Sequence, residues 1–209
     1  MAAPIIDSLV NDLSPRTPMR SWQGAAAVAC ATLAACVLLV GALGMRKDLM
    51  GGDVPGIFFI RQGILLLLGS ATSVAVIGMA QPSVGRDGGG WGWALGAALL
   101  FPATSLLIGI FSGGLYTVDT ESSLTCIISS GLSAILIGGA LVFWLRRGAP
   151  TAPERAAWLT GLAAGALGAF AYGLHCPMNG LDYIGLWYGT AVSMCAVTGR
   201  LVVPYMIRW

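Results

Sequence analysis

Residues 22–44 of the chain read WQGAAAVACATLAACVLLVGALG, a run that contains no charged side chain. A helix of about 20 apolar residues is long enough to cross the roughly 30 Å hydrocarbon core of a bilayer. Because backbone groups in lipid must form their hydrogen bonds within the protein, such a run is predicted to be a transmembrane helix. This stretch therefore decides the fold class before any motif is considered.

The rest of the chain repeats this pattern. Of its 209 residues, 56% are hydrophobic and only 10% are charged, whereas soluble domains carry about 25% charged residues. We therefore expect an all-α polytopic membrane protein. The formal net charge of +2 is too small to indicate a nucleic-acid partner. Six spans are predicted, at about residues 22–44, 57–80, 91–112, 124–145, 156–174 and 183–203.

The distribution of basic residues orients these spans. An even number of spans leaves both termini on one side, and Lys and Arg are enriched on the cytoplasmic side. The side with the termini holds eight such residues, namely Arg16, Arg20, Arg86, Arg146, Arg147, Arg155, Arg200 and Arg208. The other side holds three, namely Arg46, Lys47 and Arg61. We therefore predict that both termini are cytoplasmic, that the first loop is a local exception, and that Arg61 snorkels to the headgroups.

The fifth predicted span carries small residues at a spacing that favours close packing of helices. Gly161 and Gly165 lie four positions apart, as do Ala164 and Gly168. Small residues at this spacing let two helix backbones approach each other in lipid. We expect this span to pack closely against its neighbours.

Residues 1–21 form a tail before the membrane domain, which we assign to residues 22–209. The tail's apolar residues recur at helical spacing and form one stripe, made of Ile5, Ile6, Leu9, Val10 and Leu13. Arg16 and Arg20 follow in a short basic linker. The stripe could lie on the membrane, pack on the protein's own loops, or dock into a groove on a soluble partner. The polar face lacks Lys and Arg, which argues against the membrane surface.

Two of the five cysteines occupy distinctive positions. Cys126 and Cys176 each lie where a predicted span meets a predicted outer loop, so we expect both thiols to be exposed to water. They could form a disulfide in an oxidising periplasm, or, with the adjacent His175, bind a thiophilic ion such as Cu(I) or Zn. Alternatively, they are ordinary small residues at helix ends. The other cysteines lie within spans, where packing is the expected role: Cys30, Cys36 and Cys195.

The sequence offers little support for an enzyme. It contains one histidine, no nucleotide-binding loop and no Cys-x-x-Cys motif. A membrane thiol or quinone redox enzyme that uses the same two cysteines remains the alternative function. A small transporter is disfavoured, since transporters usually place charged residues deep inside their spans.

Several short motifs are typical of one family. They are GALGAFAYGLHCP at 165–177, LWY at 186–188, RW at 208–209, LTC at 124–126 and DLSP at 12–15. Through them the chain resembles the NrsF-like family, negative regulators of sigma F, over nearly its whole length. The resemblance implies a bacterial inner-membrane anti-sigma factor with six spans. Such a protein holds an extracytoplasmic-function sigma factor inactive until a stress signal arrives.

The resemblance also implies roles for particular residues. Cys126 and Cys176 would take part in sensing, and the cytoplasmic N-terminus would bind the sigma factor. We expect metal binding or oxidation at the two thiols to change how the fourth and fifth spans pack. That change would alter the presentation of residues 4–20 and release the sigma factor.

Overall fold

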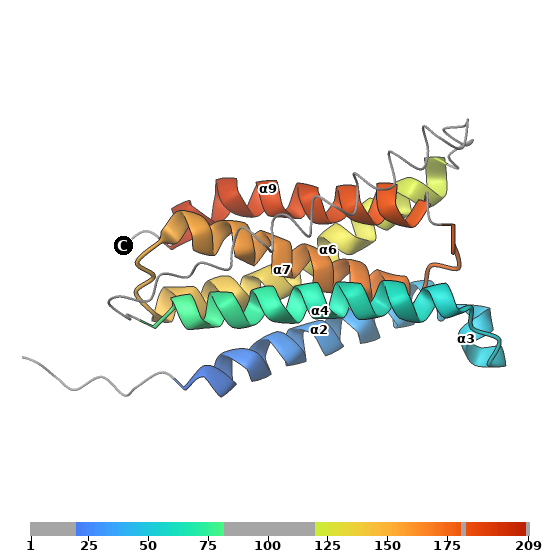
Figure 1. Cartoon of the computed structure of the whole chain (residues 1–209), viewed down its shortest axis with the longest axis horizontal. Coiled ribbons are helices and arrows are strands. Elements are labelled where there is room, and N and C mark those ends of the chain that lie inside the picture. Colours follow the sequence, from blue (N-terminus) through green and yellow to red (C-terminus); the bar gives the residue numbers. More distant parts are fainter. Residues whose placement is uncertain (1–19, 82–119, 181–182, 208–209) are drawn as a thin grey trace, which may run out of the picture.

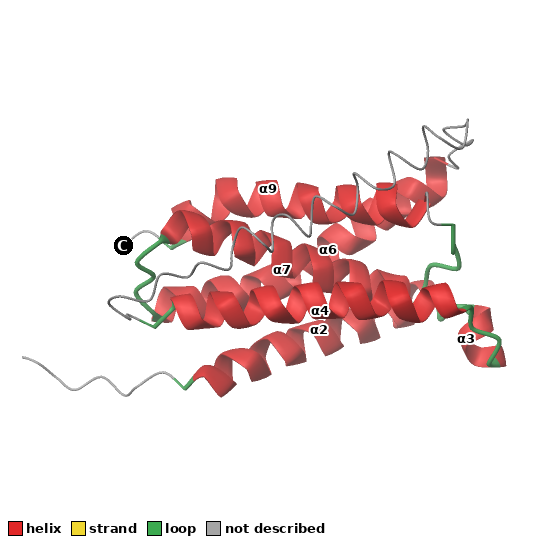
Figure 2. Ribbon diagram, viewed as in Figure 1, coloured by secondary structure: helices red, strands yellow, loops and turns green. Residues whose placement is uncertain are grey.

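The computed structural model of the chain describes residues 20–81, 120–180 and 183–207. All regular secondary structure within these ranges is helical (Figure 2), which confirms the all-α prediction. In chain order the elements are α2 (Ser21–Leu43), α3 (Lys47–Gly51), α4 (Gly56–Met79), α6 (Thr120–Arg147), α7 (Pro153–Gly173), the π-helix η1 (Ile184–Tyr188) and α9 (Gly189–Met206).

Five of the described helical segments are long and apolar enough to cross a membrane, with η1 and α9 forming one of them. They match the first, second, fourth, fifth and sixth predicted spans to within a few residues. The largest difference is in α6, which begins at Thr120 and not at residue 124. The predicted span 91–112 lies outside the described residues, so the number of six spans stays a prediction.

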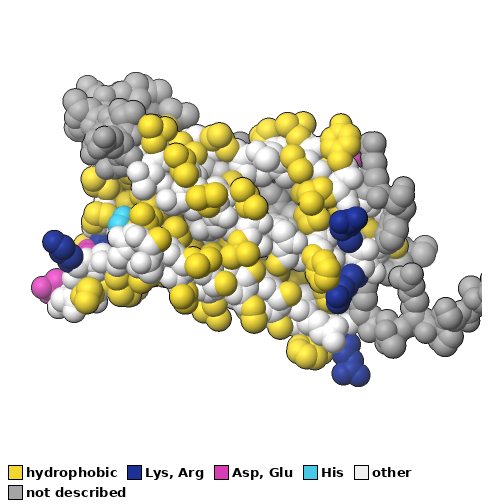
Figure 3. All heavy atoms as spheres, turned by 180° about the vertical axis from the view of Figure 1, so that it is seen from behind, with side chains coloured by type: hydrophobic (Ala, Val, Ile, Leu, Met, Phe, Trp, Pro, Cys, Tyr) yellow, Lys and Arg dark blue, Asp and Glu magenta, His cyan; other side chains and the backbone are white. Residues whose placement is uncertain are grey.

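The long helices lie side by side along one axis (Figure 1). The starts of α2 and α7 and the ends of α4, α6 and α9 share one end of the bundle. We call this the basic end, because five arginines lie there: Arg20, Arg146, Arg147, Arg155 and Arg200. The opposite end, which we call the loop end, contains residues 44–55 and 174–180. Figure 3 shows basic side chains at both ends of this face: at the basic end, and beside Asp or Glu at the loop end, where the single His also lies.

Helix α7 forms the centre of the bundle. Its span is 89% buried, whereas that of α2 is 11% buried, and it contacts α4, α6 and α9. The predicted close packing is confirmed: Gly161 and Gly165 face the backbone of α9, and Gly168 faces that of α6. A Cβ added at Gly168 would lie only 2.6 Å from the carbonyl oxygen of Ser130. Small residues thus allow three helices to surround α7 at short range.

We expect Gly168→Ala to destabilise the bundle. The new methyl group would meet the backbone of α6, and overpacking of this kind typically costs about 1–3 kcal/mol. Thermal unfolding of the detergent-solubilised protein measures the effect. Gly139→Ala is the matched control, because a Cβ at Gly139 meets nothing within 4 Å. Equal unfolding temperatures for the two variants would contradict the close approach of α6 and α7.

Candidate functional site

The structure brings Cys126 and Cys176 together at the loop end. Cys126 lies in α6 and Cys176 in the loop after α7, and both belong to one buried cluster with Tyr172 and Tyr188. Both cysteines are free thiols, and they are close enough to interact electrostatically. Their exposed fractions are 0% and 2%, so the expectation that both thiols face water is wrong. The reason is that α6 begins before the predicted span, which places Cys126 inside the bundle.

His175 lies beside the thiol pair but makes a different contact. Its Nδ1 atom is 2.9 Å from the carbonyl oxygen of Gly44, and its ring lies 5.9 Å from that of Tyr172. In the parts of the chain that the structure describes, no three His, Cys, Asp or Glu side chains form a group suited to a metal ion. A metal site made of Cys126, Cys176 and His175 therefore stays a prediction.

Two buried arginines hold the loop that carries Cys176. From α4, Arg61 donates hydrogen bonds to the carbonyl oxygens of Gly173, at 3.2 Å, and Met178, at 2.9 Å. From the loop before α3, Arg46 donates to the carbonyl oxygen of Cys176 at 3.1 Å. Only 1% of Arg61 is exposed, so the prediction that it snorkels to the headgroups is wrong. Its helix face points into the bundle, where backbone carbonyls replace water as hydrogen-bond acceptors.

Aromatic rings surround the same two guanidinium groups. The Phe58 ring centroid lies 4.9 Å from Cζ of Arg46 and 5.5 Å from that of Arg61. The Tyr188 ring centroid lies 5.0 Å from Cζ of Arg61. Such cation–π contacts are strongest where water is excluded. Tyr188 is the last residue of the π-helix η1, and single turns of π-helix often occur at functional sites.

Two buried polar atoms in this region have no hydrogen-bond partner among the described residues, namely Arg61 Nε and Gln62 Oε1. The buried hydroxyls of Ser130 and Tyr188 lie beside the thiols of Cys126 and Cys176. Arg61 also forms no ion pair with a described carboxylate. Because unpaired buried polar groups and charges are costly, their presence beside the thiols makes the loop end the candidate functional region.

The loop end also contains an ion pair between Arg46 and Asp48, in which Arg46 Nε lies 2.7 Å from Asp48 Oδ1. The hydrogen bond from Arg46 lowers the pKa of the Asp48 carboxyl. Because the pKa is lowered, the ion pair stabilises the fold fully at pH values above the ordinary Asp pKa of about 4. This stabilisation is lost as the pH falls through the lowered pKa of Asp48 in the folded protein.

We therefore expect Asp48→Asn to lower the thermal stability of the solubilised protein near neutral pH. The difference from wild type should disappear in acid, once Asp48 is protonated in both states. Thermal unfolding curves between about pH 7 and pH 2 measure this dependence. Asp53→Asn, at an exposed position of the same end, is the control. A difference that persists unchanged to the lowest pH would contradict the ionic role of Asp48.

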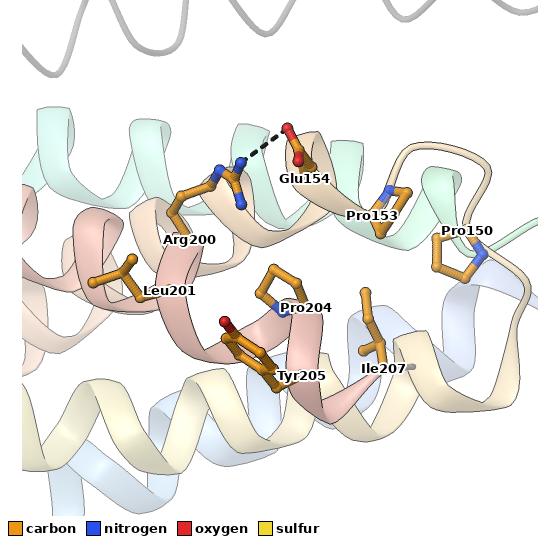
Figure 4. Close-up of a pocket in the computed structure, with 8 residues that line it drawn as sticks. All are labelled: Pro150, Pro153, Glu154, Arg200, Leu201, Pro204, Tyr205 and Ile207. Atoms are coloured by element: carbon orange, nitrogen blue, oxygen red, sulfur yellow. Dashed lines mark ion pairs between the residues drawn. The ribbon is translucent and has the colours of Figure 1, made fainter. Parts of the chain in front are cut away.

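A cavity of about 420 Å³ lies at the basic end (Figure 4). Its lining comes from the start of α7, the loop before it and the end of α9: Pro150, Pro153, Glu154, Arg200, Leu201, Pro204, Tyr205 and Ile207. An ion pair between Arg200 and Glu154, at 2.9 Å, lies on its wall. The cavity thus combines apolar walls with one charged pair, at the same end from which the N-terminal tail emerges.

Comparison with known proteins identifies the family. The family model described as negative regulator of sigma F, NrsF, matches residues 9–209. The chain belongs to the NrsF family. Its relatives include the anti-sigma-F factor NrsF of Caulobacter vibrioides, which is 31% identical over 98% of both chains. The probable anti-sigma-F factor NrsF of Azospira oryzae is 28% identical over 92% of this chain and 91% of its own length. No solved structure matches.

Membership of the NrsF family confirms the resemblance found in the sequence. The structure adds residues to the site that the sequence did not assign to it: Arg46, Phe58 and Gln62. It also places Tyr188, quoted above only within a family motif, beside Arg61. Of the predicted sigma-binding residues, Arg20 is described and is exposed at the basic end. The other six, Ile5, Ile6, Leu9, Val10, Leu13 and Arg16, lie outside the described residues.

Proposed function

We propose that this NrsF-family chain is a multi-pass inner-membrane anti-sigma factor and not an enzyme. It holds an extracytoplasmic-function sigma factor inactive in the cytoplasm and releases it under stress. The two relatives are named anti-sigma-F factors, and a chain that matches over nearly its whole length is expected to act on a partner of the same class. The five long apolar helices support the membrane location.

The orientation follows from the charged side chains. The five arginines of the basic end are fully or partly exposed, whereas Arg46 and Arg61 of the loop end are buried. The burial of these two arginines leaves Lys47 as the exposed basic residue among the three counted on this side, because Arg46 and Arg61 bind the protein's own backbone and do not face headgroups. The positive-inside rule then supports a cytoplasmic basic end. Both termini are cytoplasmic, and the thiol pair lies on the periplasmic side.

The N-terminal tail provides the contact with sigma. Its stripe, Ile5, Ile6, Leu9, Val10 and Leu13, docks as an amphipathic helix into a groove on the partner. Arg16 and Arg20 connect this helix to α2. Burial of five aliphatic side chains contributes on the order of 7–15 kcal/mol, and ordering the segment costs a comparable amount. The net affinity is modest, so a small change in the membrane domain can release the partner.

Cys126 and Cys176 receive the signal, which is a thiophilic metal ion or an oxidant. The observation that most supports this role is that residues 50 positions apart meet as free thiols, beside a buried arginine, at the end of the bundle opposite the tail. Thiols in a buried cluster are protected from non-specific modification. Any reagent that reaches them must disturb the packing of α6 and the Cys176 loop, which gives a route to a conformational signal.

Co-purification tests the proposal. The full-length protein is solubilised from bacterial membranes in detergent, and the proteins bound to it are identified by mass spectrometry. We expect a sigma factor to be recovered with the wild type and lost when residues 1–20 are deleted. Recovery of the sigma factor without the tail would contradict tail docking, and absence of any sigma factor from the wild-type sample would contradict the function.

A membrane thiol or quinone redox enzyme is the second candidate, because a buried thiol pair beside an arginine also suits electron transfer. This enzyme function requires catalytic turnover of a quinone or a dithiol substrate. Quinone reduction or dithiol oxidation by the purified protein, lost in Cys126→Ser, would favour the enzyme. Stoichiometric thiol modification without turnover, coupled to sigma release, would favour the regulator.

A further inference from the structure

The thiol pair and the tail lie at opposite ends of the bundle, so some element must connect them. Helix α4 makes contacts at both ends. It runs from Gly56 at the loop end to Met79 at the basic end, and the rise of 1.5 Å per residue separates Arg61 from Ile77 by about 24 Å. It therefore contacts different groups at its two ends.

At the loop end, α4 is attached to the Cys176 loop through Arg61. Its two terminal nitrogens bind the carbonyl oxygens of Gly173, the last residue of α7, and of Met178, in the loop after Cys176. The guanidinium also interacts electrostatically with Cys126 and packs on the ring of Tyr188. Arg61 therefore contacts the Cys176 loop and η1, and it lies near Cys126 of α6. Displacement of the Cys176 loop changes the hydrogen bonds of α4.

At the basic end, α4 packs on the first turn of α2, the helix that follows the tail. The Trp144 indole nitrogen faces the carbonyl oxygen of Ile77 at 3.5 Å. A Cβ added at Gly24 would lie 2.8 Å from the Trp144 ring and 3.2 Å from the Ile77 side chain. Ala80 accepts a hydrogen bond from the backbone of Ala149 at 3.2 Å. The end of α4 thus packs directly on the first turn of α2, four residues after Arg20.

The burial of the helices distinguishes α4 from α7. Helix α7 also runs from one end to the other, but its span is 89% buried and its glycines contact the backbones of α6 and α9. A shift of α7 would require both neighbours to move. The α4 span is 39% buried, and among the described helices α4 packs mainly on α7, so a shift of α4 involves fewer neighbours than a shift of α7.

We propose that α4 carries the state of the thiol pair across the bundle to the root of the tail, and that Arg61 is the positioning residue that couples the Cys176 loop to it. This inference rests on the proposed function and assigns its transmitting element. It differs from the expectation that the fourth and fifth spans, α6 and α7, transmit the signal. A change at Cys126 or Cys176 moves the carbonyls that Arg61 binds, α4 follows, and the contact of Ile77 with Trp144 and Gly24 alters how α2 presents the tail.

The test compares sigma release from wild type, Arg61→Gln and Arg61→Lys. The complex of the full-length protein with its co-purified sigma factor is treated with mercuric chloride, a thiol-binding probe. We expect the wild type to release sigma and Arg61→Gln to release at least tenfold less, although its untreated complex is intact and its thiols still bind mercury. Arg61→Lys keeps the charge but not the two-pronged geometry, so it should fail as well. Lys47→Gln, an exposed cation at the same end, should behave as wild type.

The outcomes separate the two proposals. A wild-type complex that keeps sigma after its thiols bind mercury contradicts the proposed function. Wild-type release with equal release from Arg61→Gln contradicts only the α4 route and leaves α6, which carries both Cys126 and Trp144, as the transmitter. If neither Arg61 variant binds sigma before treatment, hydrogen–deuterium exchange of the wild-type protein tests the α4 route instead. Mercury binding should change the exchange of residues 76–81, and unchanged exchange there would overturn the α4 route.

Discussion

Leu9→Asp in the N-terminal tail is expected to abolish capture of the sigma factor. Leu9 lies in the middle of the apolar stripe, so its burial in a partner's groove contributes about 1.5–3 kcal/mol, and an unpaired carboxylate there adds a further desolvation cost. A loss of about 3 kcal/mol or more weakens binding by a factor of roughly 100 or greater. Co-purification of sigma from detergent-solubilised membranes measures the loss, while membrane insertion is unchanged.

The control for this variant is Ser8→Asp. It adds the same charge one residue away, on the polar side of the same helix, so sigma binding should remain close to that of wild type. A tail that captures sigma equally well with Asp at position 9 would show that the stripe does not enter a groove. Equal loss in both variants would indicate that added negative charge, and not the stripe, controls binding.

Replacement of both Cys126 and Cys176 by Ser is expected to leave the cell without a stress response. Serine is close in size to cysteine, so the buried cluster should keep its packing. The serine hydroxyl, however, does not form disulfides and is a poor ligand for thiophilic metals. The sigma factor should stay bound at all times. A sigma-dependent reporter, followed during exposure to a thiophilic metal or a thiol oxidant, should lose its induction entirely.

The matched control is the double substitution Cys30→Ser and Cys36→Ser. It removes the same number of thiols from α2, whose span is 11% buried, far from the thiol pair in the sequence. Induction in this control should equal that of wild type. A normal response in Cys126→Ser/Cys176→Ser would exclude the thiol pair as sensor, and loss of response in both double variants would indicate a general effect of lost thiols.

The positions of the long helices could be predicted from the sequence because lipid imposes a simple rule. An apolar run of about 20 residues such as 22–44 has almost no alternative to a helix, and the five described spans differ from their predicted ranges by only a few residues. The spacing of small residues in α7 also predicted its packing. Helix position and the spacing of small residues depend on local sequence, so they can be read without knowledge of the tertiary structure.

The arrangement of the candidate site could not be predicted to the same extent. Arg61 follows four apolar residues at the start of its predicted span, a position equally compatible with snorkelling and with burial. One signal was available: the polar residues Arg61, Gln62, Thr72 and Ser73 recur at helical spacing in α4, and all are buried. Polar side chains on one face of a span usually point toward the protein interior. Which loop that face would meet depends on tertiary packing.

The burial of the thiols was missed for a related reason. Cys126 looked exposed because hydropathy placed the start of its span at residue 124, whereas α6 begins at Thr120. The extra turn contains Glu121, Ser122 and Ser123, which carry no hydropathy signal for a membrane helix. A boundary shift of one turn moves a side chain from the rim of a bundle to its interior, and hydropathy alone does not resolve it.

The two buried arginines reach the Cys176 loop and the end of α7 largely through main-chain oxygens, those of Gly173, Met178 and Cys176, while Arg46 also binds the side chains of Asp48 and Asn179. Every residue type offers the same carbonyl group, so substitution of Met178 leaves its acceptor in place. In the proposed sensor, the hydrogen bonds that position the Cys176 loop therefore depend little on the side chains around the thiols. A related protein could exchange the side chains around the thiols, and with them the stimulus that the proposed sensor detects, while keeping the same hydrogen bonds between the arginines and the main chain. Selectivity and transmission can then evolve separately within one fold.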